Sequence, residues 1–223
     1  MFAEISGFLF LFIIVVLIAA TSRYDYEIFS ELDSAAMLQE ISEDPKKFRI
    51  GTMLVLVEHV IIITLAVSLF IAFNQYNLLL GVIWVCARSI EGLIQIYRKR
   101  DYWDLLNIAN LYSGAHSGEK DALNDSALAI LKSKNSAFSI SQILFSIGTL
   151  AYSIMFVISG VIPEIIGWFG IAAGIIYGVG NCIFLIRPNN KALWNLGGLL
   201  IWIFELVLGG WLLFSALIPF QHE

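Results

Sequence analysis

The chain has 223 residues, of which 59% are hydrophobic and only 14% are charged, and its formal net charge is −5 at pH 7. Soluble domains average roughly 45–50% apolar and about 25% charged residues, so this composition excludes a water-soluble globular protein, and the excess apolar surface must face lipid. The negative charge leaves no basic footprint for nucleic acid. Both cysteines, Cys86 and Cys182, lie in apolar segments, which excludes a disulfide framework.

Six segments are apolar over the roughly 20 residues that a helix needs to cross a bilayer. They cover residues 2–20, 51–73, 76–97, 137–160, 164–186 and 194–219. A secretory signal begins with a basic region, and the first segment has none before it, so we expect a span there. The predicted fold is an all-α integral membrane protein, a six-transmembrane-helix bundle that forms a single domain over 1–223.

The basic residues predict how the spans are threaded. Twelve of the thirteen lysines and arginines fall in the loops 21–50, 98–136 and 187–193, and none falls in the other connections or at either terminus. Short loops rich in lysine and arginine stay in the cytoplasm. We therefore predict a multi-pass protein of the plasma membrane, with both termini outside and the three basic loops cytoplasmic.

Two polar segments in these loops have helical periodicity. Residues 24–44 hold seven acids and no base, with apolar side chains at helical spacing before Pro45, and they predict an amphipathic helix. Its acidity argues against docking on anionic lipid, and favours packing on the protein's own cytoplasmic face or binding a partner. Residues 121–134 predict a second helix, either separate or an extension of the fourth span.

The fifth predicted span has small residues along one face. They are Gly167, Gly170, Gly174 and Gly178. Small residues allow two helix backbones to approach closely in lipid. We favour packing inside the monomer. Association with a second copy or with a complex partner, and a ligand lying along the glycine face, are the alternatives.

Five ionisable residues and one amide lie inside the spans. They are Glu58, His59, Arg88, Glu91, Glu205 and Asn181. Each ionisable group costs about 2.5–3.5 kcal/mol in hydrocarbon, so such groups normally face the bundle interior and pair. Arg88 and Glu91 are three residues apart, so they share a helix face and can pair directly. All six lie in the predicted cytoplasmic half or near the bilayer centre, which favours one polar pocket open to the cytoplasm.

The charges of this predicted pocket do not balance, since one arginine faces three carboxylates. Desolvation and like-charge repulsion both disfavour ionised carboxylates. We therefore expect either a protonated glutamate at pH 7, or a bound cation. Two alternatives stay open: a structural ion network that joins Arg88, Glu91 and Glu205, or residues that do not converge at all.

Signals for catalysis and for metal binding are weak. Glu58 and His59 are adjacent on a helix and point about 100° apart, which makes them poor co-ligands for zinc. The sequence has no HExxH pair and no nucleophile elbow. We predict no metal and no catalytic residue, and the sequence leaves the cofactor unknown.

Three sequence elements occur in order along the chain. They are Arg88-Ser-Ile-Glu91-Gly92, Gly160-Val-Ile-Pro163-Glu-Ile-Ile166-Gly-Trp-Phe-Gly170 and Glu205-Leu-Val-Leu-Gly-Gly-Trp211-Leu-Leu. Together they resemble an uncharacterised prokaryotic membrane family catalogued as domain of unknown function 4386. The chain departs from that family at Glu164, where a basic residue is usual, and at Phe214-Ser215, where Lys-Gly is frequent. The resemblance implies that Arg88, Glu91 and Glu205 belong to a shared pattern, and it implies no activity.

We expect a small binding or transport protein whose pocket takes a proton, a cation or a small polar ligand. Arg88 would anchor an anionic group or hold the carboxylates, and Glu205 would be the titrating member. The alternative is a structural or accessory subunit of a membrane complex that docks through the glycine face or through 24–44. A lipid-modifying intramembrane enzyme is the least favoured reading.

Overall fold

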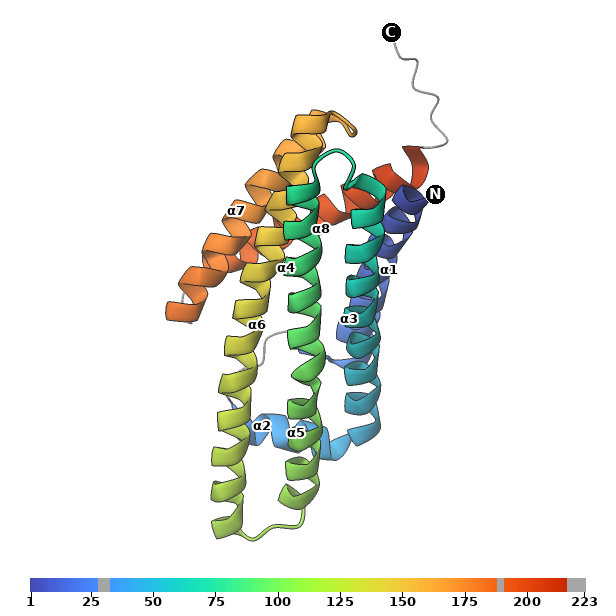
Figure 1. Cartoon of the computed structure of the whole chain (residues 1–223). Helices are drawn as coiled ribbons and strands as arrows, with labels where there is room; N and C mark the ends of the chain where they lie inside the picture. Colours follow the sequence, from blue (N-terminus) through green and yellow to red (C-terminus); the bar gives the residue numbers. More distant parts are fainter. Residues whose placement is uncertain (28–32, 188–190, 216–223) are drawn as a thin grey trace. The chain divides into compact units, whose positions relative to one another are not determined.

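The computed structural model describes residues 1–27, 33–187 and 191–215, and all regular secondary structure among them is helical (Figure 1). The helices are α1 (Phe2–Tyr24), α2 (Ser34–Glu43), α3 (Pro45–Phe73), α4 (Leu78–Tyr97), α5 (Lys99–Tyr112), α6 (Ser117–Ser159), α7 (Glu164–Ile186) and α8 (Ala192–Phe214). Six helices or helix runs are long and apolar enough to cross a membrane: α1, α3, α4 with α5, α6, α7 and α8. The predicted all-α membrane bundle is therefore confirmed.

The two longest of these runs, α6 and α4 with α5, far exceed the length that a bilayer requires. α6 has 43 residues, and at about 1.5 Å per residue it extends about 65 Å, roughly twice the hydrocarbon thickness. Its apolar part is the C-terminal half, so the predicted 121–134 helix is the N-terminal extension of this one helix. α5 continues almost directly from α4 and forms a helix within the predicted loop 98–136.

The predicted helix over 24–44 is shorter in the structure. α2 begins after Asp33, whose side chain accepts a hydrogen bond from the Ala36 amide at 3.0 Å and caps the helix. α1 ends at Tyr24, and Asp25 has a positive φ of 48°, which closes the last turn of α1. Residues 28–32 of the predicted helix lie outside the described residues. Pro45 is the first residue of α3, a position that proline favours.

By their internal contacts the helices form two compact units. Unit 1 contains 1–15, 60–93 and 139–223, and unit 2 contains 16–59 and 94–138. The bounds of α1, α3, α4 and α6 place residues of each of these helices in both units. Each unit is described by itself below.

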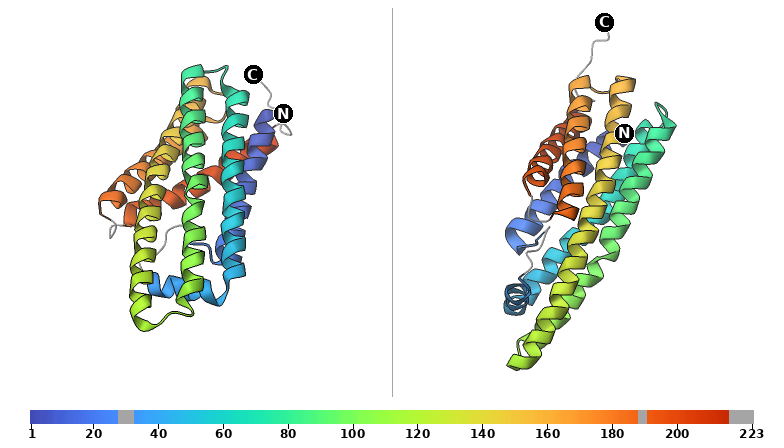
Figure 2. Two further views of the ribbon diagram at one scale, coloured as in Figure 1. Left: turned by 60° about the horizontal axis from the view of Figure 1, so that its bottom comes forward. Right: turned by 90° about the vertical axis from the view of Figure 1, so that its left-hand side faces the viewer.

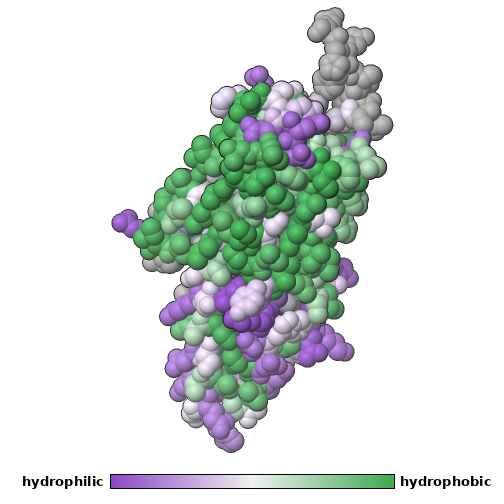
Figure 3. All heavy atoms as spheres, in the orientation of Figure 1, coloured by the Kyte–Doolittle hydropathy of each residue, from purple (hydrophilic) through white to green (hydrophobic). Residues whose placement is uncertain are grey.

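Unit 1 has an aromatic and aliphatic core. Trp84 of α4 meets Tyr152 of α6 edge-on, with ring centroids 4.5 Å apart, and Tyr152 stacks on Phe204 of α8. α7 and α8 pack side by side (Figure 2). The surface of unit 1 over α7 is strongly hydrophobic in the view of Figure 3, and its exposed side chains include Ile165 and Trp168. Such an exposed apolar surface fits contact with lipid.

Unit 2 has a smaller core between three helices. Leu38 and Ile41 on the apolar face of α2 pack against α5 and α6. The facing residues are Leu105, Leu106 and Ala109 of α5 and Ala127 and Leu131 of α6. Apolar positions at spacings of three and four give α5 its buried face. The packing of α2 on the protein itself is one of the two arrangements expected for the acidic segment.

Candidate functional site

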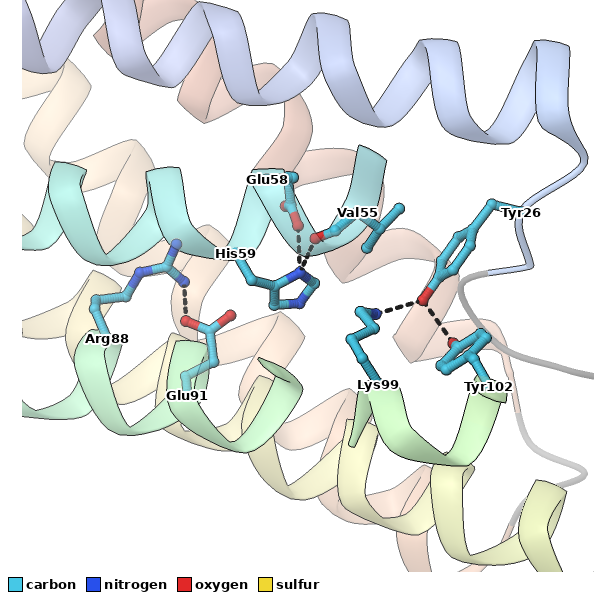
Figure 4. Close-up of polar contacts among 8 residues, drawn as sticks. All are labelled: Tyr26, Val55, Glu58, His59, Arg88, Glu91, Lys99 and Tyr102. Carbon is cyan, nitrogen blue, oxygen red and sulfur yellow. Dashed lines mark hydrogen bonds and ion pairs between the residues drawn. The ribbon is translucent and has the colours of Figure 1, made fainter. Parts of the chain in front are cut away.

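A buried ion pair lies on α4 in unit 1. Arg88 Nη1 is 2.7 Å from Glu91 Oε2, and both residues are only 2% exposed (Figure 4). The spacing of three residues places the two side chains on one helix face, as the sequence indicates. Burying two charges together is tolerable only because each compensates the other.

The Arg88 guanidinium is also enclosed by aromatic rings. Its central carbon lies 4.2 Å from the centroid of Phe145 on α6 and 5.5 Å from the centroid of Trp84. A ring face attracts a cation, and the attraction grows when water is excluded. Gly148 gives the side chain room, because a Cβ there would lie 3.0 Å from Arg88 Cγ and 3.1 Å from Cδ. Arg88 is therefore held from several sides.

Other polar side chains of unit 1 face the same charges. Glu205 of α8 interacts electrostatically with Arg88, as does Glu91. Tyr152 of α6 and Tyr177 of α7 both interact with Arg88 and Glu205. We call these five residues the Arg88 cluster. Four helices, α4, α6, α7 and α8, contribute to it.

Asn181 joins the Arg88 cluster through Tyr177. Its amide nitrogen donates a hydrogen bond of 2.9 Å to the Tyr177 carbonyl, and its side chain also approaches the Tyr177 hydroxyl. That hydroxyl donates to Gln142 Oε1 at 3.0 Å. Asn181 is fully buried. The structure thus brings four of the six predicted site residues together, namely Arg88, Glu91, Asn181 and Glu205.

Glu58 and His59 belong to unit 2 and form a pair of their own on α3. His59 Nδ1 lies 2.7 Å from Glu58 Oε2 and 2.5 Å from the Val55 carbonyl oxygen (Figure 4). Although adjacent helical residues start out about 100° apart, these two side chains bend toward each other. Among the described residues, no group of three or more His, Cys, Asp or Glu side chains is arranged to hold a metal ion.

The glycine face of α7 lies against α6 within unit 1. A Cβ at Gly167 would lie 2.6 Å from Val157, one at Gly174 would lie 3.2 Å from Leu150, and one at Gly178 would lie 3.1 Å from Ser146. Gly170 approaches Ser153 and Phe204 more closely still. These glycines set a close approach of the two helices inside the chain.

The acidic segment lines a hollow of about 290 Å³ in unit 2, together with aromatic side chains that include Tyr26, Phe48 and Tyr102. Several of its carboxylates have local partners. Asp25 pairs with Lys47, and Asp44 accepts a hydrogen bond of 2.9 Å from the Lys47 amide. These contacts tie the end of α1 to the beginning of α3.

The sequence reading missed a second buried polar group, also in unit 2. Lys99 of α5 and Lys134 of α6 are 3% and 4% exposed, and both lie beside Tyr26 or Tyr102. The sequence reading treated the two lysines only as topology signals. The helical spacing of Tyr102, Leu105 and Leu106 was the available signal that this segment has a buried face.

Comparison with known proteins gives one match. The family model described as Domain of unknown function (DUF4386) matches residues 5–216. No curated protein and no solved structure matches the chain. The match covers both units and contains the three sequence elements on which the predicted resemblance rested, with Arg88, Glu91 and Glu205 among their residues. The prediction is confirmed, and the chain belongs to the DUF4386 family.

Proposed function

We propose that the protein is a small membrane binding or transport protein in which the Arg88 cluster takes up a proton, a cation or a small polar group. The observation that carries the proposal is the ion pair between Arg88 and Glu91, buried to 2% exposure and accompanied by a second carboxylate, Glu205. Ionisable groups inside membrane proteins are costly and often mark ion or substrate paths.

Charge decides which ligands the cluster favours. Arg88 is the one permanent cation of the cluster, and it faces the two carboxylates of Glu91 and Glu205. With both carboxylates ionised, the cluster would carry an excess negative charge in a medium of low dielectric, which a proton or a cation relieves. We assign the exchangeable proton to Glu205, the carboxylate that α8 contributes to the cluster.

We infer a prokaryotic plasma membrane as the location, with both termini outside. Twelve of thirteen basic residues lie in alternate connections, and such connections remain in the cytoplasm. In this orientation α2 and α5, which belong to the basic connections 21–50 and 98–136, lie on the cytoplasmic side. Reporter fusions at the two termini test the orientation, and a cytoplasmic signal from either terminus would overturn it.

The test of the function is a pair of glutamine substitutions in the full chain, reconstituted in lipid. Glu205→Gln removes one titratable carboxyl of the Arg88 cluster, and Glu164→Gln removes an exposed carboxyl at the start of α7. Infrared difference spectra between about pH 6 and about pH 8.5 report protonation of carboxyl groups. We expect a carboxyl band in the wild type and in E164Q, and its loss in E205Q.

A structural role is the second candidate, because the contacts of Arg88 with Phe145, Trp84 and Gly148 also suit a permanent lock between α4 and α6. In that case the protein would act as an accessory subunit of a membrane complex. This reading expects spectra of the wild type that do not change with pH, together with a loss of thermal stability in E205Q. That pair of results would overturn the proposed binding function.

A further inference from the structure

The buried lysines of unit 2 lie outside the apolar segments of their helices. The run Leu78–Tyr112 has 35 residues and extends about 53 Å, and α6 extends about 65 Å, so neither fits inside a hydrocarbon layer of about 30 Å. The apolar parts are 76–97 and 137–160. Lys99 and Lys134 fall between them, in the polar connection, and yet both are buried.

Lys99 is bonded to a pair of tyrosines. Its Nζ donates a hydrogen bond of 2.7 Å to the Tyr26 hydroxyl, which in turn lies 2.5 Å from the Tyr102 hydroxyl (Figure 4). The two tyrosine rings are stacked, with centroids 5.4 Å apart. Lys99 Nζ also lies 5.0 Å and 4.7 Å from these two centroids, within the range of cation–π attraction.

Lys134 reaches the same place from α6. Its Nζ lies 4.9 Å from the Tyr102 centroid and donates a hydrogen bond of 3.3 Å to the Glu27 carbonyl oxygen. Tyr102 therefore contacts both amines. Both amines also hold the short segment Tyr26–Glu27, which follows α1.

The surroundings of the amines lower their pKa values toward neutral pH. Burial lowers the pKa of Lys99 to about 8. Burial, followed by repulsion from Lys99, lowers the pKa of Lys134 to about 7. The hydroxyls of Tyr26 and Tyr102 keep their protons, because burial raises the pKa of each well above its usual range.

Charged groups face the amines from each neighbouring element. Glu58 of α3 favours the charged form of Lys99, and Glu27 and Asp101 favour that of Lys134. Asp101 of α5 is itself paired with Arg98 at 2.8 Å. These carboxylates offset the burial only in part, so the ammonium forms remain disfavoured inside unit 2.

We propose that Lys99, Lys134, Tyr26 and Tyr102 form a pH-sensitive latch that holds the segment after α1 against α5 and α6, closed when the amines are neutral and opened when they take up protons. The direction of this pH dependence follows from desolvation. A protonated amine is stabilised by moving into water, so protonation favours any arrangement that exposes it. Acidification therefore opens the latch, and a rise in pH closes it.

The latch has a natural reporter. The Tyr26 amide donates a hydrogen bond of 3.0 Å to the Ala20 carbonyl, so this amide is protected from hydrogen exchange while the latch is closed. Exchange of this peptide is measured in the full chain in lipid at about pH 8.5 and about pH 7.5, and corrected for the chemical rate with a short unstructured peptide. If opening exposes both amines, the opening equilibrium rises roughly 25-fold over this step.

Two methionine variants on α6 complete the experiment. Lys134→Met removes one titrating amine. The rise in the opening equilibrium between the two pH values then falls to about threefold, which is the contribution of Lys99 alone. Lys132→Met removes an exposed amine two residues away and keeps the full wild-type response. A wild type whose corrected exchange does not change with pH would overturn the latch, and so would a K134M response equal to that of the wild type.

A second measurement on the wild type keeps the proposal testable if K134M does not fold. An amine-reactive acetylating reagent modifies only neutral amines, and mass spectrometry follows each lysine separately. We expect the reactivity of Lys134, corrected for the chemical rate of the reagent, to change with pH around about pH 7, and the reactivity of the exposed Lys132 to follow a different profile. Identical profiles for the two lysines would overturn the latch.

Discussion

The two units contain buried cations of different kinds. Arg88 in unit 1 is bonded to a carboxylate at 2.7 Å and keeps its charge permanently. Lys99 in unit 2 is bonded to a neutral tyrosine hydroxyl at 2.7 Å, and its charge depends on pH. Both cations lie against aromatic rings. The comparison indicates that aromatic contact accommodates either buried cation, and that the type of basic group decides whether the charge depends on pH.

Replacing Arg88 tests the permanently charged cation of unit 1 and has the largest expected effect on stability. Arg88→Met leaves the buried carboxylate of Glu91 without its cation, and such a change costs about 3–5 kcal/mol. Denaturation of the purified protein in mixed micelles measures the loss. The double variant R88M/E91Q removes both partners and should recover part of the stability. Equal stability of R88M and the wild type would show that the pair contributes nothing.

Replacing Lys134 tests the buried amines of unit 2, whose charge depends on pH. The folded pKa of Lys134, about 7, lies below the ordinary value of 10.5, so between these values the unfolded chain binds more protons. Stability therefore rises with pH across this window and falls on acidification toward pH 7. Between about pH 7 and about pH 8.5 the Lys134 contribution is about 2 kcal/mol, and K134M should lack it. Parallel pH–stability curves for the two proteins would contradict this.

Filling the space at Gly148 sharpens the account of Arg88. A methyl group there would lie 3.0 Å from Arg88 Cγ and 3.3 Å from Trp84, so Gly148→Ala forces both side chains to shift. Overpacking of this kind costs about 1–3 kcal/mol. Gly210→Ala on α8 is the matched control, since a methyl group there meets no atom within 4 Å. Equal free energies of unfolding for the two variants would show that Arg88 is not tightly held.

The smallest expected effect concerns the cap of α2 in unit 2. Asp33→Ala removes the acceptor for the Ala36 amide and should cost about 1 kcal/mol. Asp33→Asn keeps an acceptor in place and should retain most of the stability. Hydrogen exchange at the first turn of α2 checks both variants. A D33A helix that exchanges as slowly as the wild type would show that packing alone fixes this end.

The sequence predicted the spans and the Arg88–Glu91 pair because both are local. Hydrophobic length determines a span, and a spacing of three on a helix determines the pair. The burial of Lys99 was not predictable in this way, since its partner Tyr26 lies 73 residues away along the chain. The length of α2 was misjudged because the positive φ of Asp25 and the cap at Asp33 interrupt an amphipathic pattern that looks continuous.

Asp44 has a consequence for how this chain tolerates changes of length. It is the C-cap residue of α2, and its side chain also accepts a hydrogen bond from the Lys47 amide at the start of α3. No other residue therefore separates the two helices. One inserted residue would rotate α2 by about 100° and carry Leu38 and Ile41 away from α5. The connection between α2 and α3 therefore has a fixed length. We expect relatives to have no insertion or deletion at this position.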